Sequence, residues 1–341
     1  MEISVRQSNQ LKSIAILMML CLHLFNRDYK GLFEPLLFIG KQPLTYYISL
    51  FCDACVPIFA FVSGYGLYYK FVQNKTVFVK DNVIRLKKLY INYWIIILIF
   101  PIIIGLILKI PGYPGSWDKF LVNFFGVDTS YNGAWWFFTV YVLFVLTSRF
   151  WFSITDKLNP ILSVFFFFAI YLIAFYFRVY KANLFENSFL NYLQGQTANY
   201  FCTLFQFMLG AFALKYQWNS NISEYFKNIK YKDVLIFVLI TMLLMIHAII
   251  PNFIIAPFTG LAFILLYCQL DLSNNIQKSI DFFTPHSTNL WLIHMFFYLI
   301  FFPGFIYSFN YPIIIFSVLV LICVLCSVLI NFINKKMQTL I

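Results

Sequence analysis

The chain has 341 residues, of which 62% are hydrophobic and 22% aromatic, while only 11% carry a charge. Soluble globular domains average about 45–50% apolar and about 25% charged residues, so this composition excludes an ordinary soluble domain. The formal net charge of +11 comes from basic residues that lie between long apolar runs, which indicates membrane topology rather than binding to nucleic acid.

Ten segments are apolar and long enough to cross a lipid bilayer, for which a helix needs about 20 residues. They lie near residues 11–26, 46–70, 89–108, 134–152, 160–178, 197–215, 233–250, 253–269, 287–302 and 312–333. The first resembles an export signal, but we interpret it as a retained span because no small-residue cleavage site follows it. We therefore predict an all-α polytopic membrane protein with about ten transmembrane helices.

Basic residues accumulate on one side of these spans. Seventeen Lys and Arg residues flank the side that carries both termini, and seven flank the other. The positive-inside rule then places both termini in the cytoplasm. The longest loops, near 27–45, 109–133 and 179–196, fall outside, where they either shape a cleft or simply connect the spans. We expect one membrane domain over residues 1–341 and no appended soluble domain.

His23 is the first candidate for chemistry, because ionisable groups inside a span are costly and therefore point to function. It follows Lys12 by eleven residues, which is about three helical turns, so the two side chains share one face about 16 Å apart. Lys12 then lies at the cytoplasmic edge and His23 well inside the bilayer.

Asp53 lies at a similar depth on the second span, which runs the opposite way. A carboxylate there either orients the imidazole of His23 or faces a water-filled outer vestibule, and the residues leave both alternatives open. Farther along the same span, Ser63-Gly64-Tyr65 places small residues where close helix packing is expected.

The third span is entered through a basic stretch that contains Arg85, Lys87 and Lys88. Such a patch attracts anions, although topology and lipid phosphates explain single lysines equally well. Arg85 is the stronger candidate because a guanidinium binds phosphate with two parallel hydrogen bonds.

A cationic inner entrance that leads to a membrane-embedded histidine suits a coenzyme A thioester, which carries phosphates at one end and the acyl sulfur at the other. His23 would take a proton from an attacking hydroxyl or become transiently acylated, and the residues do not choose between these routes. All seven cysteines fall in apolar segments, which favours packing over disulfides, so we expect no metal site.

Several segments resemble, in order, the membrane-bound acyltransferase-3 family. The main ones are RQSNQLKSIAILMMLCLH (6–23), VPIFAFVSGYGLYY (56–69) and RLKKLYINYW (85–94). Weaker similarities are Trp135-Trp136, FMLG (207–210) and STNLWLIH (287–294). The resemblance implies transfer of an acyl group, commonly acetyl and not amino-acyl, from a cytoplasmic acyl-CoA to a hydroxyl of an extracytoplasmic polysaccharide or glycolipid.

The resemblance also implies a multi-pass protein of the cell membrane, with acetyl-CoA or another acyl-CoA as co-substrate and no permanently bound cofactor. It makes His23 the catalytic residue, and we keep Asp53 as its candidate partner. The candidate substrate-binding residues are Lys12, Arg85, Lys88, Ser63 and Tyr65.

Two positions depart from the family pattern. Lys12 stands where an arginine is usual, and Lys88 stands where the second arginine of an Arg-x-x-Arg pair is expected, so charge is kept but the bidentate fork is lost. The alternatives are a glycan or lipid transporter or export component, and an inactive homologue that acts as a scaffold. The acceptor, a homo-oligomeric state and the roles of His247, His286 and His294 are left open.

Overall fold

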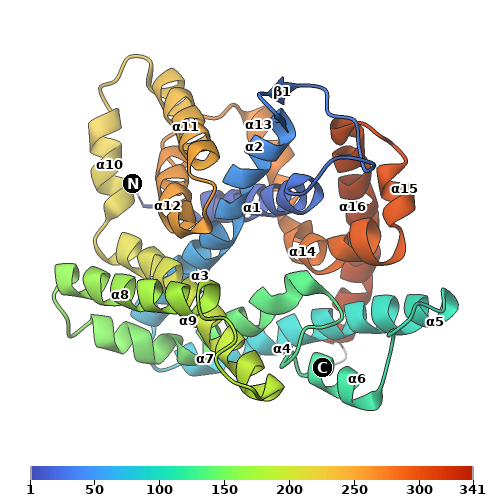
Figure 1. Cartoon of the computed structure of the whole chain (residues 1–341). Helices are drawn as coiled ribbons and strands as arrows, with labels where there is room; N and C mark the ends of the chain where they lie inside the picture. The colour runs from blue at the N-terminus through green and yellow to red at the C-terminus, as the bar shows by residue number, and fades with distance from the viewer. Residues whose placement is uncertain (1, 340–341) are drawn as a thin grey trace.

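The computed structural model describes residues 2–339, and these residues are predominantly helical, as predicted (Figure 1). The α-helices are α1 (Val5–Phe25), α2 (Leu44–Phe51), α3 (Cys55–Gln73), α4 (Phe78–Ile97), α5 (Gly105–Ile107), α6 (Trp117–Phe124), α7 (Trp136–Thr155), α8 (Pro160–Val179), α9 (Ser188–Lys215), α10 (Trp218–Phe226), α11 (Lys232–Ile249), α12 (Ala256–Tyr267), α13 (Asn274–Asp281), α14 (Ser287–Met295), α15 (Pro303–Tyr307) and α16 (Pro312–Thr339).

Shorter elements connect or extend these helices. The 3₁₀ segments are η1 (Cys52–Ala54), η3 (Gly133–Trp135), η4 (Phe253–Ile255) and η5 (Thr284–His286), and the π-helical segments are η2 (Leu98–Ile104) and η6 (Phe296–Phe301). Strands β1 (Phe38–Ile39) and β2 (Gln42–Pro43) form an antiparallel hairpin. In the view of Figure 1, α1 lies centrally, with α14 and α16 on one side and α11 and α12 on the other.

Eight helical stretches among residues 2–339 are long and apolar enough to cross a membrane, which confirms eight of the ten predicted spans. The other two are shorter: η4 and α12 cover 253–267, and α14 with η6 covers 287–301. The start predicted for the third span was wrong, because α4 begins at Phe78 rather than near residue 89. The basic stretch is thus helical, since a helix satisfies its own backbone hydrogen bonds and continues past the apolar core.

Loops that ten alternating crossings would place on the same side of the membrane contact each other. Lys75, after α3, forms an ion pair of 3.2 Å with Asp156, after α7, at the end that the charge count assigns to the cytoplasm. At the opposite end, the backbone N–H of Glu34 donates to the carbonyl of Asn310 at 2.8 Å. We call these the predicted inner end and the predicted outer end.

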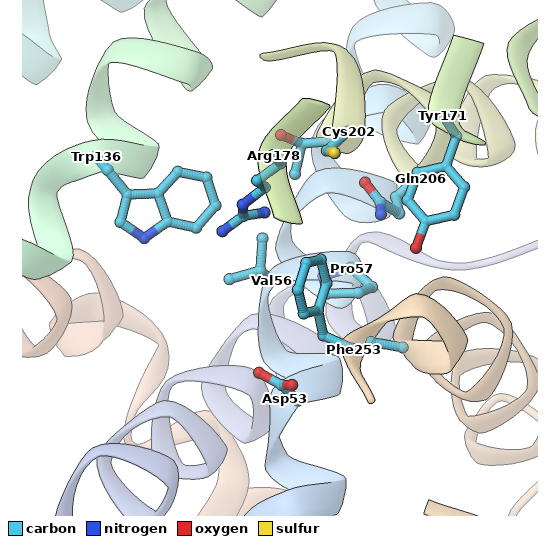
Figure 2. Close-up of a pocket in the computed structure, with 11 residues that line it drawn as sticks. Asp53, Val56, Pro57, Trp136, Tyr171, Arg178, Cys202, Gln206 and Phe253 are labelled. Carbon is cyan, nitrogen blue, oxygen red and sulfur yellow. The ribbon is translucent and has the colours of Figure 1, made fainter. Parts of the chain in front are cut away.

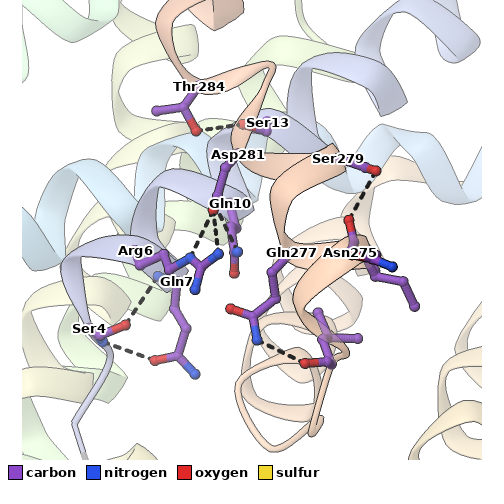
Figure 3. A network of polar contacts seen from close by, with 12 residues as sticks. Ser4, Arg6, Gln7, Gln10, Ser13, Asn275, Gln277, Ser279, Asp281 and Thr284 are labelled. Carbon is purple, nitrogen blue, oxygen red and sulfur yellow. Dashed lines mark hydrogen bonds and ion pairs between the residues drawn. The ribbon is translucent and has the colours of Figure 1, made fainter.

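Polar contacts fasten α1 to α13 at the predicted inner end (Figure 3). Arg6 lies 2.6 Å from the carboxylate of Asp281, and the Gln10 amide donates to the same carboxylate at 2.9 Å. The hydrogen bonds from Arg6 hold the pKa of Asp281 below its usual range because they favour the charged form. A lowered pKa stabilises the fold above the unfolded-state pKa, so this link is present at neutral pH and lost in acid.

Buried amides join α4, α14 and α16 near the same end. Asn92 donates to Asn289 at 2.8 Å, and Asn289 donates to Ser327 and Asn331 at 2.9 Å each. Asn334 closes the set by donating to Asn92 at 3.1 Å. Because lipid offers no partner for an amide, this network holds the three helices in one register.

Helices α3 and α9 cross with almost no space between their backbones. A Cβ atom on Gly64 would lie 1.7 Å from the carbonyl oxygen of Phe207, and one on Gly210 would lie 2.0 Å from that of Phe61. This confirms the close packing expected at Ser63-Gly64-Tyr65 and gives the glycine of the FMLG segment the same role.

We expect Gly64→Ala and Gly210→Ala each to lower the free energy of unfolding by about 3 kcal/mol or more, because the added methyl group meets a backbone carbonyl. The matched control is Gly66→Ala, since nothing lies within 4 Å of its Cβ position. That variant should be unchanged or about 1 kcal/mol more stable, because alanine favours a helix. Equal melting temperatures for Gly64→Ala and Gly66→Ala in detergent would contradict this packing.

Candidate active site

His23 and His294 lie side by side, although 271 positions separate them. His23 belongs to the last turn of α1, and His294 lies next to the end of α14, just before the π-helix η6. Nδ1 of His23 lies 2.7 Å from Nε2 of His294, and the rings stack with their centroids 5.0 Å apart. His294 is fully buried, whereas His23 keeps partial exposure.

The contacts of His294 fix the position of the proton on each ring. Its Nδ1 lies 3.0 Å from the carbonyl of Leu290 and 2.8 Å from that of Trp291. A carbonyl only accepts, so Nδ1 of His294 carries the proton and Nε2 of the neutral ring is an acceptor. The 2.7 Å contact then requires a proton on Nδ1 of His23. The remaining nitrogen of His23, Nε2, therefore keeps its lone pair for a substrate.

A cation and a phenol complete this site. Arg27, four residues after His23, donates from Nη2 to the carbonyl of His23 at 2.7 Å. Its guanidinium lies 5.1 Å from the ring centre of Tyr298, which stacks on His294 at 5.9 Å. The Nε atom of Arg27 is buried and has no hydrogen-bond partner among residues 2–339. The histidine pair therefore has an unused donor close by.

Asp53 lies in η1 and lines a pocket at the predicted outer end, together with Arg178 and Trp136 (Figure 2). No hydrogen bond recorded among residues 2–339 joins Asp53 to His23, and the position beside Nδ1 of His23 belongs to His294. Of the two alternatives for Asp53, the geometry matches the outer vestibule. Its catalytic role stays a prediction.

Two cations that the sequence analysis singled out lie near each other toward the predicted inner end. Lys12 on α1 and Tyr141 on α7 both lie within electrostatic range of Arg85 on α4. Both cations are half-buried, and neither takes part in an ion pair within residues 2–339. Like charges that meet without a carboxylate repel each other, and a bound anion relieves that repulsion.

The other candidate substrate-binding residues lie apart from the histidine pair. Lys88 is exposed on α4. The hydroxyl of Ser63 donates to the carbonyl of Phe59 within its own helix at 2.7 Å, and that of Tyr65 donates to Glu2 at 3.2 Å, which anchors the N-terminal segment. Their contacts with substrate stay predictions.

The remaining histidines contact hydroxyl groups. His247 lies 3.3 Å from the hydroxyl of Thr259, and His286 lies 2.9 Å from that of Ser327. The cysteines are free, and within residues 2–339 no three His, Cys, Asp or Glu side chains gather as metal ligands would.

Sequence reasoning did not identify His294 as the partner of His23, and it overlooked Arg27. A histidine inside a span signals that a partner exists, but it does not say which residue of another helix supplies it. Arg27 did leave a signal, because a residue four positions after His23 lies on the same helical face if the helix continues.

Comparison with known proteins identifies the family. The acyltransferase-3 family model, described as an acyltransferase domain, matches residues 5–332. No curated protein and no solved structure gives a significant match. The matched region spans essentially the whole chain, with both histidines of the pair and both inner cations inside it. The chain therefore belongs to the acyltransferase-3 family and is a membrane acyltransferase.

Proposed function

We propose that this protein is an O-acyltransferase of the cell membrane, which transfers an acyl group, most simply acetyl, from cytoplasmic acyl-CoA to a hydroxyl of an extracytoplasmic glycan or glycolipid. The observation that carries the proposal is the hydrogen-bonded series from the carbonyls of Leu290 and Trp291 through His294 to His23. It leaves an unprotonated imidazole nitrogen, as a general base or an acyl-accepting nucleophile requires.

In direct transfer, Nε2 of His23 takes the proton of the acceptor hydroxyl while its oxygen attacks the thioester carbonyl. The new C–O bond forms a tetrahedral intermediate, and the C–S bond then breaks. The leaving coenzyme A thiolate takes the proton back from the imidazolium. In the two-step route, the same nitrogen attacks the thioester carbonyl, and the C–S bond breaks to release the coenzyme A thiolate. The acceptor hydroxyl then attacks the acyl carbon, the bond from that carbon to nitrogen breaks, and the hydroxyl proton passes through water to the thiolate.

The neighbours of His23 support this chemistry. His294 holds the ring orientation and accepts from Nδ1, so it is a positioning residue comparable to the third member of a catalytic triad. Arg27 is the cation closest in sequence to His23, and its free Nε–H suits the negative charge that develops on the carbonyl oxygen.

The donor is assigned to the predicted inner end. Lys12 and Arg85 offer two cations without a carboxylate partner, which suits the phosphates of coenzyme A. Lys12 and His23 occupy the same helix, with about 16 Å of helical rise between them. The extended arm of the coenzyme thus has a path along α1 from its phosphates to the reacting carbon.

We expect His23→Ala to reduce acylation at least about 100-fold, because a general base contributes about 10²–10⁴-fold. Membrane insertion and the thermal stabilisation by acetyl-CoA should be retained. The measurement is the acyl content of surface glycans by mass spectrometry in cells that carry the variant. Unchanged acylation in the variant would contradict the catalytic role of His23. If acetyl-CoA stabilised neither the wild-type protein nor the variant, the result would favour a transporter or a scaffold.

The positioning role of His294 has a separate test. His294→Leu should lower kcat about 100-fold with little change in the KM for acetyl-CoA, because the imidazole loses its acceptor but not its donor site. His294→Gln should recover part of the loss, since its amide can also accept from His23 and donate to a carbonyl. Equal activity of both variants would contradict a hydrogen-bonded role.

We expect Arg85→Ala to weaken acetyl-CoA binding about 10–100-fold, the loss of one charge-assisted hydrogen bond of about 1.5–3 kcal/mol. Lys88→Ala should have a smaller effect because Lys88 is exposed. Lys278→Ala is the control, since it removes an exposed cation from α13 at the same end. Isothermal titration calorimetry with acetyl-CoA measures the affinity of each variant. Equal losses of affinity in all three variants would mean that only the net charge of this end matters, which would contradict a specific role of Arg85.

A further inference from the structure

The pocket that holds Asp53 contains hydrogen-bonding groups that the reaction above does not use. Its volume is about 140 Å³, and it lies between η1, α3, α7, α8, α9, η4 and α12 at the predicted outer end (Figure 2). An apolar protein cavity of about 150 Å³ holds one benzene molecule. The pocket therefore has room for about one six-membered ring, and not for a chain of them.

Gln206 supplies the first sign that this pocket binds a ligand. The residue is 6% exposed, and its Oε1 atom has no hydrogen-bond partner within residues 2–339. Buried polar atoms are nearly always paired, because an unpaired one loses its hydration without compensation. An occupant of the pocket with an O–H or N–H group would pair with this oxygen.

Charged groups of both signs line the same space. The guanidinium of Arg178 lies 5.3 Å from the ring centre of Trp136 and 4.9 Å from that of Phe253, and these contacts fix its orientation. It is within electrostatic range of Asp53, whose carboxylate accepts no hydrogen bond recorded among residues 2–339. One positive and one negative charge make the lining neutral overall, which favours a neutral ligand over an anion.

The other hydroxyls of the lining already have partners. Tyr171 donates to the carbonyl of Ile254 at 3.0 Å, and Thr203 donates to that of Asn199. The groups left for a ligand thus include two acceptors, on Gln206 and Asp53, and the cationic donor of Arg178. A hydroxyl both donates and accepts, so a polyol satisfies all of them.

The segment that carries Asp53 packs against the part of α1 that carries His23. Segment η1 packs against α1, and the thiol of Cys52 lies close to that of Cys21 in the outer half of this helix. Cys21 precedes His23 by two residues, and Cys52 precedes Asp53 directly. A ring held in the pocket is thereby near the helix that carries the proposed base.

We propose that this pocket binds a neutral pyranose ring of the acceptor, with the C–H face of the sugar on Trp136. Its hydroxyls donate to Gln206 and Asp53 and accept from Arg178. The inference rests on the proposed function and names its acceptor class: a neutral sugar, rather than a uronic acid or a sugar phosphate.

Saturation-transfer difference NMR on the full chain in lipid nanodiscs tests this assignment. The neutral probes are methyl β-D-glucopyranoside, methyl β-D-galactopyranoside and methyl N-acetyl-β-D-glucosaminide, and the anionic ones are methyl glucuronide and glucose 1-phosphate. We expect saturation transfer to at least one neutral glycoside and little transfer to the two anionic probes. No signal from any neutral sugar, or a stronger signal from the anionic ones, would overturn the proposal.

A pair of variants ties the signal to the pocket. Gln206→Leu should weaken binding of the neutral glycoside about tenfold. The melting temperature of this variant should stay equal or rise, because an unpaired buried oxygen is removed. Ser163→Ala, the control, removes another unpaired buried oxygen at the opposite end of α8 and should leave binding unchanged. Gln206→Leu with full sugar binding would overturn the assignment.

Acetyl-CoA stabilisation of the same samples separates this inference from the function on which it rests. Acetyl-CoA binding without sugar binding would overturn only the pocket, whereas sugar binding without acetyl-CoA binding would support the pocket and contradict the donor. A methyl and a dodecyl glycoside of the same sugar distinguish two sources of the ring. Tighter binding of the dodecyl form assigns a lipid-linked acceptor, and equal binding assigns a free glycan.

Discussion

A polar group inside a bilayer must find its partner within the protein, and this constraint organises the whole fold. It joins α4, α14 and α16 through asparagine amides, and it joins α1 to α14 through the histidine pair. The backbones of α3 and α9 meet at Gly64 and Gly210, where no side chain separates them. Seven buried side-chain atoms within residues 2–339 lack a hydrogen-bond partner, and two of them belong to the regions described above: Arg27 Nε beside the histidine pair and Gln206 Oε1 in the outer pocket.

The same constraint gives the candidate site its chemistry. Two backbone carbonyls determine which nitrogen of His294 carries a proton. The hydrogen bond between the two rings then determines which nitrogen of His23 carries one. No carboxylate is needed to orient the base, so no negative charge has to be buried beside it. The inner cations, the imidazole and the outer pocket are then three regions reached from α1: Lys12 and His23 lie on it, and Cys21 lies close to the segment that holds Asp53.

The parts that follow from local pattern were predictable from the sequence. Apolar length located eight of the ten predicted spans, and the small-residue step at Gly64 correctly indicated close packing. The start of α4 was misplaced because hydropathy marks where lipid begins, and a helix continues beyond it. The pairing of His23 with His294 was not predictable, since helical periodicity fixes the face of each helix but not its neighbour. For the same reason, the sequence left two alternatives for Asp53, and only the arrangement of α8 and η4 places it in one pocket with Arg178.

The protonation of His23 is the most direct test of this account, and ¹⁵N NMR of the histidine-labelled chain measures it. The chain has four histidines, so substitution of His247, His286 and His294 in turn assigns the signals. We expect a protonated Nδ1 and an unprotonated Nε2 on His23 at neutral pH, with the proton of His294 on Nδ1. A proton on Nε2 of His23 would contradict it, because that ring would then present a donor, and not a base, to the substrate.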